Sequence, residues 1–269
     1  MLKQRLLVTI FLVPVGIGIV ALGGIPFSLL VTAFLSIASW EYVQLARKGG
    51  YQPSLWLVVG GTIVFSLTRT FFQFDHADLI ISVIVLTAMF VHLLAYEKGV
   101  DTAGTDFAVT LGGILYIGWI GSYLISLRGL PNGLWWFMLV MPAAWLADSG
   151  AYLFGSRFGK HQFSPRISPR KTWEGYFGGI LFGTVCTILF AALWQIRMPS
   201  LTLLHGLFIG LLMGIVTPLG DLAESVFKRQ VGEKDSSNLI PGHGGFFDRI
   251  DSWIWAGVIG YYLVSYLWI

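Results

Sequence analysis

A charged segment, residues 225–251, lies between two long apolar stretches of the chain. It combines cations and carboxylates with a glycine-rich turn at residues 241–245. Such turns expose backbone N–H groups that can bind phosphate oxygens, and Lys and Arg side chains neutralise phosphate charge. The segment therefore predicts chemistry on a phosphate. Its expected substrate-binding residues are Ser225, Lys234, Asp235, His243, Gly244, Gly245 and Arg249, with Lys228 and Arg229 as catalytic cations. For His243 we favour a hydrogen bond to phosphate or within the loop over a role as general base.

Two pairs of carboxylates flank this segment. Asp221 and Glu224 are three residues apart and so share one helix face, and Asp248 and Asp251 repeat that spacing where the next apolar run begins. Carboxylate oxygens are suitable ligands for a hard divalent cation. We predict metal ligands at Asp221, Asp248 and Asp251, although Asp251 could serve only to stabilise a helix N-terminus.

A strongly basic loop, residues 155–175, forms a second candidate region. Its two Ser-Pro steps restrict the backbone, and the second of them precedes Lys171. We predict a phosphate-binding turn here. Its expected residues are Ser168, Arg170 and Thr172 for substrate binding and Lys171 for catalysis. The alternative is a basic loop that only sets topology and attracts anionic lipid headgroups.

A third candidate is Asp148, which lies inside an apolar run at 133–154. An ionisable side chain in a membrane helix costs about 2.5–3.5 kcal/mol on insertion scales and is a functional hypothesis by default. We therefore add Asp148 to the catalytic residues. The alternative is an acid that a neighbouring Ser or Lys satisfies.

The composition indicates which elements must position these residues. Charged residues make up only 12% of the 269, apolar residues make up 55%, and the mean hydropathy is +0.74. We predict an all-α, polytopic transmembrane bundle forming one integral-membrane domain over 1–269, with N-terminal membrane helices in 1–130 and catalytic helices and loops in 131–269. Nine spans are expected, at 6–24, 26–46, 55–73, 77–96, 107–127, 133–154, 175–196, 201–224 and 252–269. Thr68, Arg69 and Thr70 make the third of these the least regular.

The distribution of basic residues predicts the orientation. With a cytoplasmic N-terminus, all 17 Lys and Arg residues except Arg69, Arg128 and Arg197 fall on the cytoplasmic side. The C-terminus then lies outside, and the three candidate regions share the cytoplasmic face. Gly175, Gly179 and Gly183, and likewise Gly206, Gly210 and Gly214, recur every four residues and predict closely packed helices. The alternative is that membrane helices are simply rich in glycine.

The run from Ser225 to Asp251 resembles the signature of the integral-membrane phosphatidate cytidylyltransferases, the CDP-diacylglycerol synthases. The matching positions are Ser225, Phe227 to Arg229, Lys234-Asp235, Ser237, Ile240-Pro241, His243 to Phe246 and Asp248 to Asp251. The loop 168–175 and the pair Asp148-Ser149 also resemble this family, so that the likeness covers roughly residues 140–255.

This resemblance implies a reaction in which CTP and phosphatidic acid give CDP-diacylglycerol and pyrophosphate, with Mg²⁺ required. It further implies a bacterial inner-membrane enzyme of phospholipid biosynthesis, a homodimer, with its active site open to the cytoplasm. The residues that match the family's metal-binding aspartates are Asp221 and Asp248, and a monovalent ion such as K⁺ could occupy a second cation site. The expected partners are CTP, phosphatidic acid and the lipid bilayer, and no nucleic acid.

The mechanism expected from the residues needs no activated Ser or Cys, because the nucleophile is an already ionised phosphate oxygen. The obstacle is repulsion between two polyanions, which metal ions, Lys and Arg can reduce. Related CTP-using lipid enzymes, such as a polyprenol kinase or an archaeal CDP-lipid synthase, would need a similar site. A transporter would be expected to show internal repeats and charges near the midplane, and a structural scaffold would not explain the carboxylate pairs.

Overall fold

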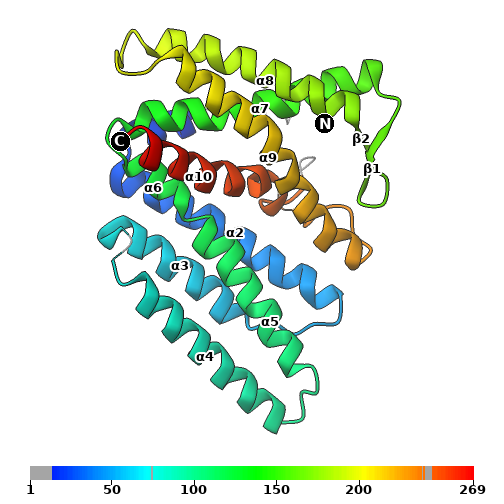
Figure 1. The fold of residues 1–269 in the computed structure, drawn as a ribbon. Helices are drawn as coiled ribbons and strands as arrows, with labels where there is room; N and C mark the ends of the chain where they lie inside the picture. The colour runs from blue at the N-terminus through cyan, green and yellow to red at the C-terminus, as the bar shows by residue number, and fades with distance from the viewer. Residues whose placement is uncertain (1–13, 74, 238, 240–243) are drawn as a thin grey trace. The chain divides into compact units, whose positions relative to one another are not determined.

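The structure is a computed structural model of the 269-residue chain, and it describes all residues except 1–13, 74, 238 and 240–243. It is almost entirely helical, as expected (Figure 1). The chain forms two compact units. Unit 1 comprises residues 1–126 and 230–250, and unit 2 comprises residues 127–229 and 251–269. The N-terminal helices and the charged segment after residue 230 therefore belong to one unit.

Unit 1 is a group of antiparallel and crossing helices. They are α2 (Gly24–Lys48), α3 (Leu55–Phe72), α4 (Ala77–Glu97), α5 (Ala103–Gly113), the π-helix η1 (Ile114–Ile120) and the first residues of α6 (Tyr123–Gly129). Helix α3 packs against both α2 and η1. Helix α4 packs on α5 (Figure 1). Two glycines permit close approach, because a Cβ on Gly113 would lie 2.6 Å from the Tyr42 ring and one on Gly118 would lie 2.9 Å from the Thr62 Cα.

The polar residues of the third predicted span do not interrupt α3. The hydroxyls of Thr68 and Thr70 each donate, at 2.8 Å, to the carbonyl four residues earlier. The buried Arg69 guanidinium lies 4.3 Å from the ring centroid of Trp119 and 4.0 Å from that of Tyr123. Aromatic faces attract a cation most strongly when water is excluded. A charge that looked incompatible with the span is thus accommodated by cation–π contacts.

Unit 2 contains four long helices and a short hairpin. Its elements are α7 (Gly133–Phe158), β1 (Gln162–Ser164), β2 (Ser168–Thr172), α8 (Trp173–Trp194), α9 (Leu203–Gln230) and α10 (Phe247–Leu267). The last residue of α9 and the first four residues of α10 belong to unit 1. Strands β1 and β2 pair antiparallel, with Gln162 opposite Thr172 and Ser164 opposite Ser168. The all-α prediction did not include this hairpin.

The glycines of α8 and α9 form the predicted close contacts. A Cβ on Gly179 would lie 2.6 Å from the Ala147 carbonyl oxygen of α7, and one on Gly210 would lie 2.6 Å from the Thr184 Cα of α8. Helix α8 therefore packs closely against α7, beside which it runs in Figure 1, and against α9. The prediction of tight helix packing is confirmed at these positions.

Seven of the described helices are long and apolar enough to cross a membrane: Gly24–Lys48, Leu55–Phe72, Ala77–Glu97, Ala103–Gly129, Gly133–Phe158, Trp173–Trp194 and Leu203–Gln230. The protein is therefore a helical integral membrane protein. The first predicted span falls partly on residues 1–13, which lie outside the described residues, although residues 14–22 are helical. The ninth corresponds to α10, which carries Asp251 and Ser252 and is not one of the seven.

Candidate active site

Three carboxylates meet in unit 2. Oxygen atoms of Asp221, Glu224 and Asp251 all lie within 4.8 Å of one another. Asp221 and Glu224 project from one face of α9, and Asp251 comes from α10. Glu224 and Asp251 are buried, whereas the Asp221 side chain is 39% exposed. Buried like charges at this separation repel one another, so a bound cation would stabilise the arrangement.

A glycine in α9 explains how the two helices come so close. A Cβ on Gly220 would lie 2.8 Å from the backbone oxygen of Asp251 and 3.2 Å from the Cα of Ser252. Any side chain at this position would push α10 away from α9. Gly220 therefore sets the separation of the carboxylates, although the sequence analysis assigned it no role.

Two lysines neutralise part of this negative charge. Lys171, at the end of β2, lies with its Nζ 2.7 Å from Asp221 Oδ2 and also donates to the Pro218 carbonyl. The Lys228 Nζ lies 2.9 Å from Glu224 Oε2, one helical turn away, and both of these side chains are buried. The Ser225 hydroxyl donates to Asp221 Oδ1 over 3.3 Å. The predicted catalytic lysines thus contact the carboxylate cluster directly.

Asp148 lies on α7 within electrostatic range of Lys171 and Asp221, and also interacts with Asp251. It is exposed in the structure. The predicted residues Asp148, Lys171, Asp221, Lys228 and Asp251 therefore gather in one place, although they come from four different elements. Glu224, which was not among the predicted metal ligands, completes the cluster.

The β-hairpin positions Lys171. Thr172 is the N-cap residue of α8, and its hydroxyl accepts a hydrogen bond from the Gly175 N–H at 3.2 Å. The Glu174 carboxylate accepts bonds from the backbone N–H groups of Lys160 and His161 and from the His161 ring. These bonds close the base of the hairpin on α8. Thr172, predicted as a substrate ligand, is thus engaged in a structural bond.

The tip of the hairpin contacts α9 through a cation. The Nε of Arg229 donates to the Ile167 carbonyl at 3.2 Å, while Arg229 remains exposed. Ser168 is half-buried and Arg170 is exposed. These predicted substrate residues border the strand that carries Lys171, and their contact with a substrate stays a prediction.

The remaining predicted residues belong to unit 1. Asp248 Oδ2 accepts hydrogen bonds from the Ser236 N–H at 2.9 Å, the Ser236 hydroxyl at 2.8 Å and the Gly245 N–H at 2.8 Å. One oxygen of this carboxylate therefore shapes the preceding loop. A role for Asp248 in binding metal, together with Asp221 of unit 2, stays a prediction.

The glycine-rich turn is described only at its end. Gly244 has φ +79°, which favours glycine, and the N–H groups of Gly245 and Phe246 donate to carboxylates. His243 lies outside the described residues. The predicted substrate residues Lys234, Asp235 and Arg249 are exposed.

A buried acid in α2 was missed by the sequence analysis. Glu41 is completely buried and accepts four hydrogen bonds from residues of the charged segment. It meets the criterion that singled out Asp148, because it is an ionisable residue inside an apolar run, predicted at 26–46. That signal was present in the sequence.

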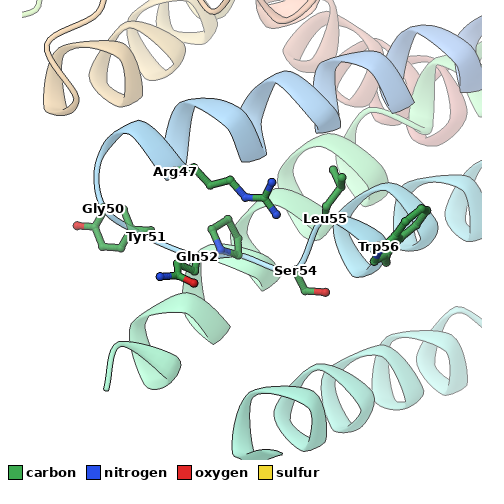
Figure 2. A pocket seen from close by; sticks show the side chains of 8 residues that line it. Arg47, Gly50, Tyr51, Gln52, Ser54, Leu55 and Trp56 are labelled. Atoms are coloured by element: carbon green, nitrogen blue, oxygen red, sulfur yellow. The ribbon is translucent and has the colours of Figure 1, made fainter. Parts of the chain in front are cut away.

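A cavity of about 610 Å³ opens where α2 joins α3. Figure 2 shows Arg47, Tyr51 and Trp56 among the side chains around it. No predicted site residue is among those that line it, and Arg47 is the one charged residue in this set. The cavity therefore lacks the acidic ligands of the carboxylate cluster.

A model of the family described as the cytidylyltransferase family matches residues 3–267. The chain belongs to this family. Curated relatives named phosphatidate cytidylyltransferase align over most of their length. The chain is 38% identical to the one from Pseudomonas aeruginosa over 94% of this chain and 93% of that protein, and 34% identical to the one from Bacillus subtilis over 98% of both. It is 31% identical to the one from Synechocystis over 98% of this chain and 97% of that protein.

In this member of the cytidylyltransferase family, the unit 2 cluster offers a suitable chemical environment for a divalent cation. Three carboxylate oxygens converge, which is the ligand type that Mg²⁺ prefers, and waters or substrate phosphates usually complete its coordination. The neighbouring lysines can stabilise negative charge on phosphates. The arrangement can therefore bind a metal–phosphate complex beside α9.

Proposed function

We propose that this protein is a phosphatidate cytidylyltransferase. A phosphate oxygen of phosphatidic acid attacks the α-phosphorus of CTP, a new P–O bond forms, and the bond to the leaving pyrophosphate breaks. The products are CDP-diacylglycerol and pyrophosphate. The observation that carries the proposal is the match to phosphatidate cytidylyltransferases over nearly the whole chain. The carboxylate and lysine cluster supplies the chemistry that this reaction needs.

The proposed metal ligands are Asp221, Glu224 and Asp251, with Asp248 as a further ligand. Mg²⁺ bound there would neutralise phosphate charge and stabilise the leaving pyrophosphate. The proximity of the first three carboxylates supports this assignment. We also propose a second cation site, occupied by a monovalent ion such as K⁺.

The two lysines of the cluster are also proposed to bind substrate phosphates. Lys171 and Lys228 are paired with Asp221 and Glu224. With these carboxylates bound to a cation, the two ammonium groups would be available to phosphate oxygens of CTP or of the lipid. Arg229 and Lys234 would extend this cationic surface, and Asp148 would orient Lys171. No general base is required, because the lipid phosphate is ionised at neutral pH.

We propose that the chain spans the bacterial inner membrane nine times, with the N-terminus in the cytoplasm and the C-terminus outside. The distribution of Lys and Arg supports this topology, which places the active site on the cytoplasmic face. Reporter fusions at residue 269 and in the loop 159–167 check it. An odd number of spans places the two termini on opposite sides of the membrane. A reporter at residue 269 that is found in the cytoplasm would therefore contradict the proposed topology.

A homodimer is a separate proposal, drawn from the family resemblance. The mass of the purified protein in detergent, corrected for bound detergent, tests whether the protein is a dimer. A monomeric mass with full activity would contradict it.

The deciding experiment incubates purified protein with Mg²⁺, phosphatidic acid and CTP labelled in the cytidine. We expect label in CDP-diacylglycerol and an equal amount of pyrophosphate. Release of CDP, with phosphate transferred to a lipid alcohol, would instead indicate a kinase. Lipid or nucleotide flux across vesicles without pyrophosphate release would indicate a transporter.

A further inference from the structure

Glu41 binds the two ends of a segment that lies far away in the sequence. Its Oε1 accepts from the Ser237 hydroxyl at 2.5 Å and the Phe246 N–H at 3.0 Å. Its Oε2 accepts from the Ser236 hydroxyl at 3.0 Å and the Phe247 N–H at 2.7 Å. The four donors come from residues 236–237 and 246–247. A carboxylate strengthens such bonds because it carries charge.

Two of these donors belong to the start of a helix. Helix α10 begins at Phe247, and the first N–H groups of a helix have no partner within it. The Glu41 carboxylate, contributed by another helix, satisfies the N–H groups of Phe246 and Phe247. Negative charge at this position is also favoured by the helix dipole. Glu41 therefore fixes where α10 begins, one residue before Asp248.

Ser236 connects Glu41 to Asp248. Its hydroxyl lies 3.0 Å from Glu41 Oε2 and 2.8 Å from Asp248 Oδ2, and its single proton can serve only one of them at a time. Two carboxylates thus share one hydroxyl group. Ser236 therefore links the position of Asp248 to that of Glu41.

Gly245 makes the close approach possible. A Cβ at this position would lie 2.5 Å from Glu41 Oε2 and 2.6 Å from Oε1, and would also overlap the Ser236 hydroxyl. Only a residue without a side chain leaves room for the carboxylate. The requirement for glycine here follows from Ser236 and Glu41 and not from a positive φ.

The rest of α2 supports the same segment. Phe34, Glu41 and Lys48 are seven residues apart and so lie along one face of the helix. The Phe34 ring lies 5.3 Å from that of Phe246, and the Lys48 Nζ lies 2.7 Å from Glu233 Oε1. Helix α2 is therefore the support on which the charged segment is built.

We propose that Glu41 is a positioning residue of the cytidylyl transfer: its buried carboxylate ties Ser236 and Ser237 to the start of α10 and so places Asp248 for its part in the reaction. The inference rests on the proposed function for its kinetic consequences. Glu41 itself touches neither substrate in this proposal. It acts through the segment that contains the family-like signature.

The test compares Glu41→Gln with Glu41→Asp and with Ser39→Ala as a matched control. Gln keeps the size of the side chain but turns one acceptor into an N–H₂ donor that faces a backbone N–H. Asp keeps the charge but withdraws it by one methylene. Ser39 is also buried in α2, but its hydroxyl pairs with Thr62 of α3 at 2.8 Å, away from the charged segment.

Kinetics provide the first measurement. For Glu41→Gln we expect kcat to fall about 10²-fold, the loss that a misplaced catalytic group can cause, and the Mg²⁺ concentration for half-maximal rate to rise. Glu41→Asp should lie between this variant and the wild type, and Ser39→Ala should keep both values. A Glu41→Gln enzyme with unchanged kcat and Mg²⁺ dependence would overturn the inference.

Hydrogen exchange provides a measurement that does not depend on activity. The amides of Gly245, Phe246 and Phe247 should be protected in the wild type and in Ser39→Ala, and should exchange faster in Glu41→Gln. Unchanged exchange would overturn the inference even if activity fell. If the wild type transferred no cytidylyl group, the proposed function would fail, while exchange would still decide whether Glu41 anchors the segment.

Discussion

The two units use buried carboxylates in opposite ways. In unit 1, the buried Glu41 accepts bonds from neutral N–H and O–H donors at both of its oxygens, which satisfy its charge within the protein. In unit 2, Asp221, Glu224 and Asp251 crowd together, and Lys171 and Lys228 form ion pairs with the first two of them.

This difference separates anchoring from ligand binding. Hydrogen-bond donors arranged around a carboxylate fix the backbone that carries them, and a metal would have to displace those bonds. Carboxylates that repel one another gain from an added cation. Burial of an acid is therefore a poor guide to its role, and the identity of its neighbours is a better one.

The largest effect is expected for Asp221→Asn. Removing one charged ligand from the cluster should lower kcat/KM roughly 10²–10³-fold, because a bound metal ion contributes several kcal/mol to stabilising the transition state. The assay is transfer of labelled CTP to phosphatidic acid by purified enzyme. Size-exclusion chromatography in detergent should show the same profile as the wild type. Normal turnover would remove Asp221 from the proposed metal site.

Metal removal, combined with one variant in each unit, should distinguish the two units. Excess chelator should abolish pyrophosphate release, and Mg²⁺ at about 100 times its Kd should stabilise the wild type by about 2.7 kcal/mol relative to the metal-free protein. Thermal unfolding in detergent measures this effect. The increase in Tm should disappear in Glu224→Gln and persist in Glu41→Gln. If the increase in Tm disappeared only in Glu41→Gln, the metal would bind in unit 1 and not in unit 2.

A smaller effect is expected when the anchor of unit 1 is overpacked. Gly245→Ala places a methyl group against the Glu41 carboxylate, and such overpacking typically costs about 1–3 kcal/mol. We expect faster amide exchange at residues 244–247. Gly60→Ala in α3 is a control in the same unit, since nothing lies within 4 Å of a Cβ there and its φ is not positive. Equal changes in exchange at 244–247 for both variants would show that the clash is unimportant.

The smallest effect is expected for Lys48→Ala. The bridge to Glu233 is short, but its side chains are 52% and 38% exposed, and exposed pairs contribute about 0–1 kcal/mol. Activity and thermal stability should stay close to those of the wild type. A large loss of activity would mean that α2 supports the charged segment mainly through its end and not through Glu41.

The sequence was sufficient where a local pattern carries the information. Hydropathy predicted the seven long apolar helices, and the four-residue spacing of Gly179 and Gly183 predicted close helix packing. The spacing of Asp221 and Glu224 predicted a shared helix face. The family resemblance was confirmed by the match over residues 3–267.

The sequence was insufficient where a side chain finds its partner through tertiary contacts. The hairpin that carries Lys171 contains Pro169 and few β-branched residues, so a basic loop was the natural expectation. Gly220 belongs to no glycine pattern, although it brings Asp251 close to α9. Glu41 carried the signal of a charge in a span, but its donors could not be read from its neighbours.

The contacts of Glu41 have a consequence for biogenesis. Its donors Ser236 and Phe247 lie 195 and 206 positions further along the chain. A protein synthesised from the N-terminus inserts α2 long before these residues leave the ribosome. During that interval the carboxylate must be hydrated or paired elsewhere, and the native connection closes only when nearly the whole chain has been made. A nascent chain that ends before residue 236 would consequently lack the four donors that this acid has in the complete protein.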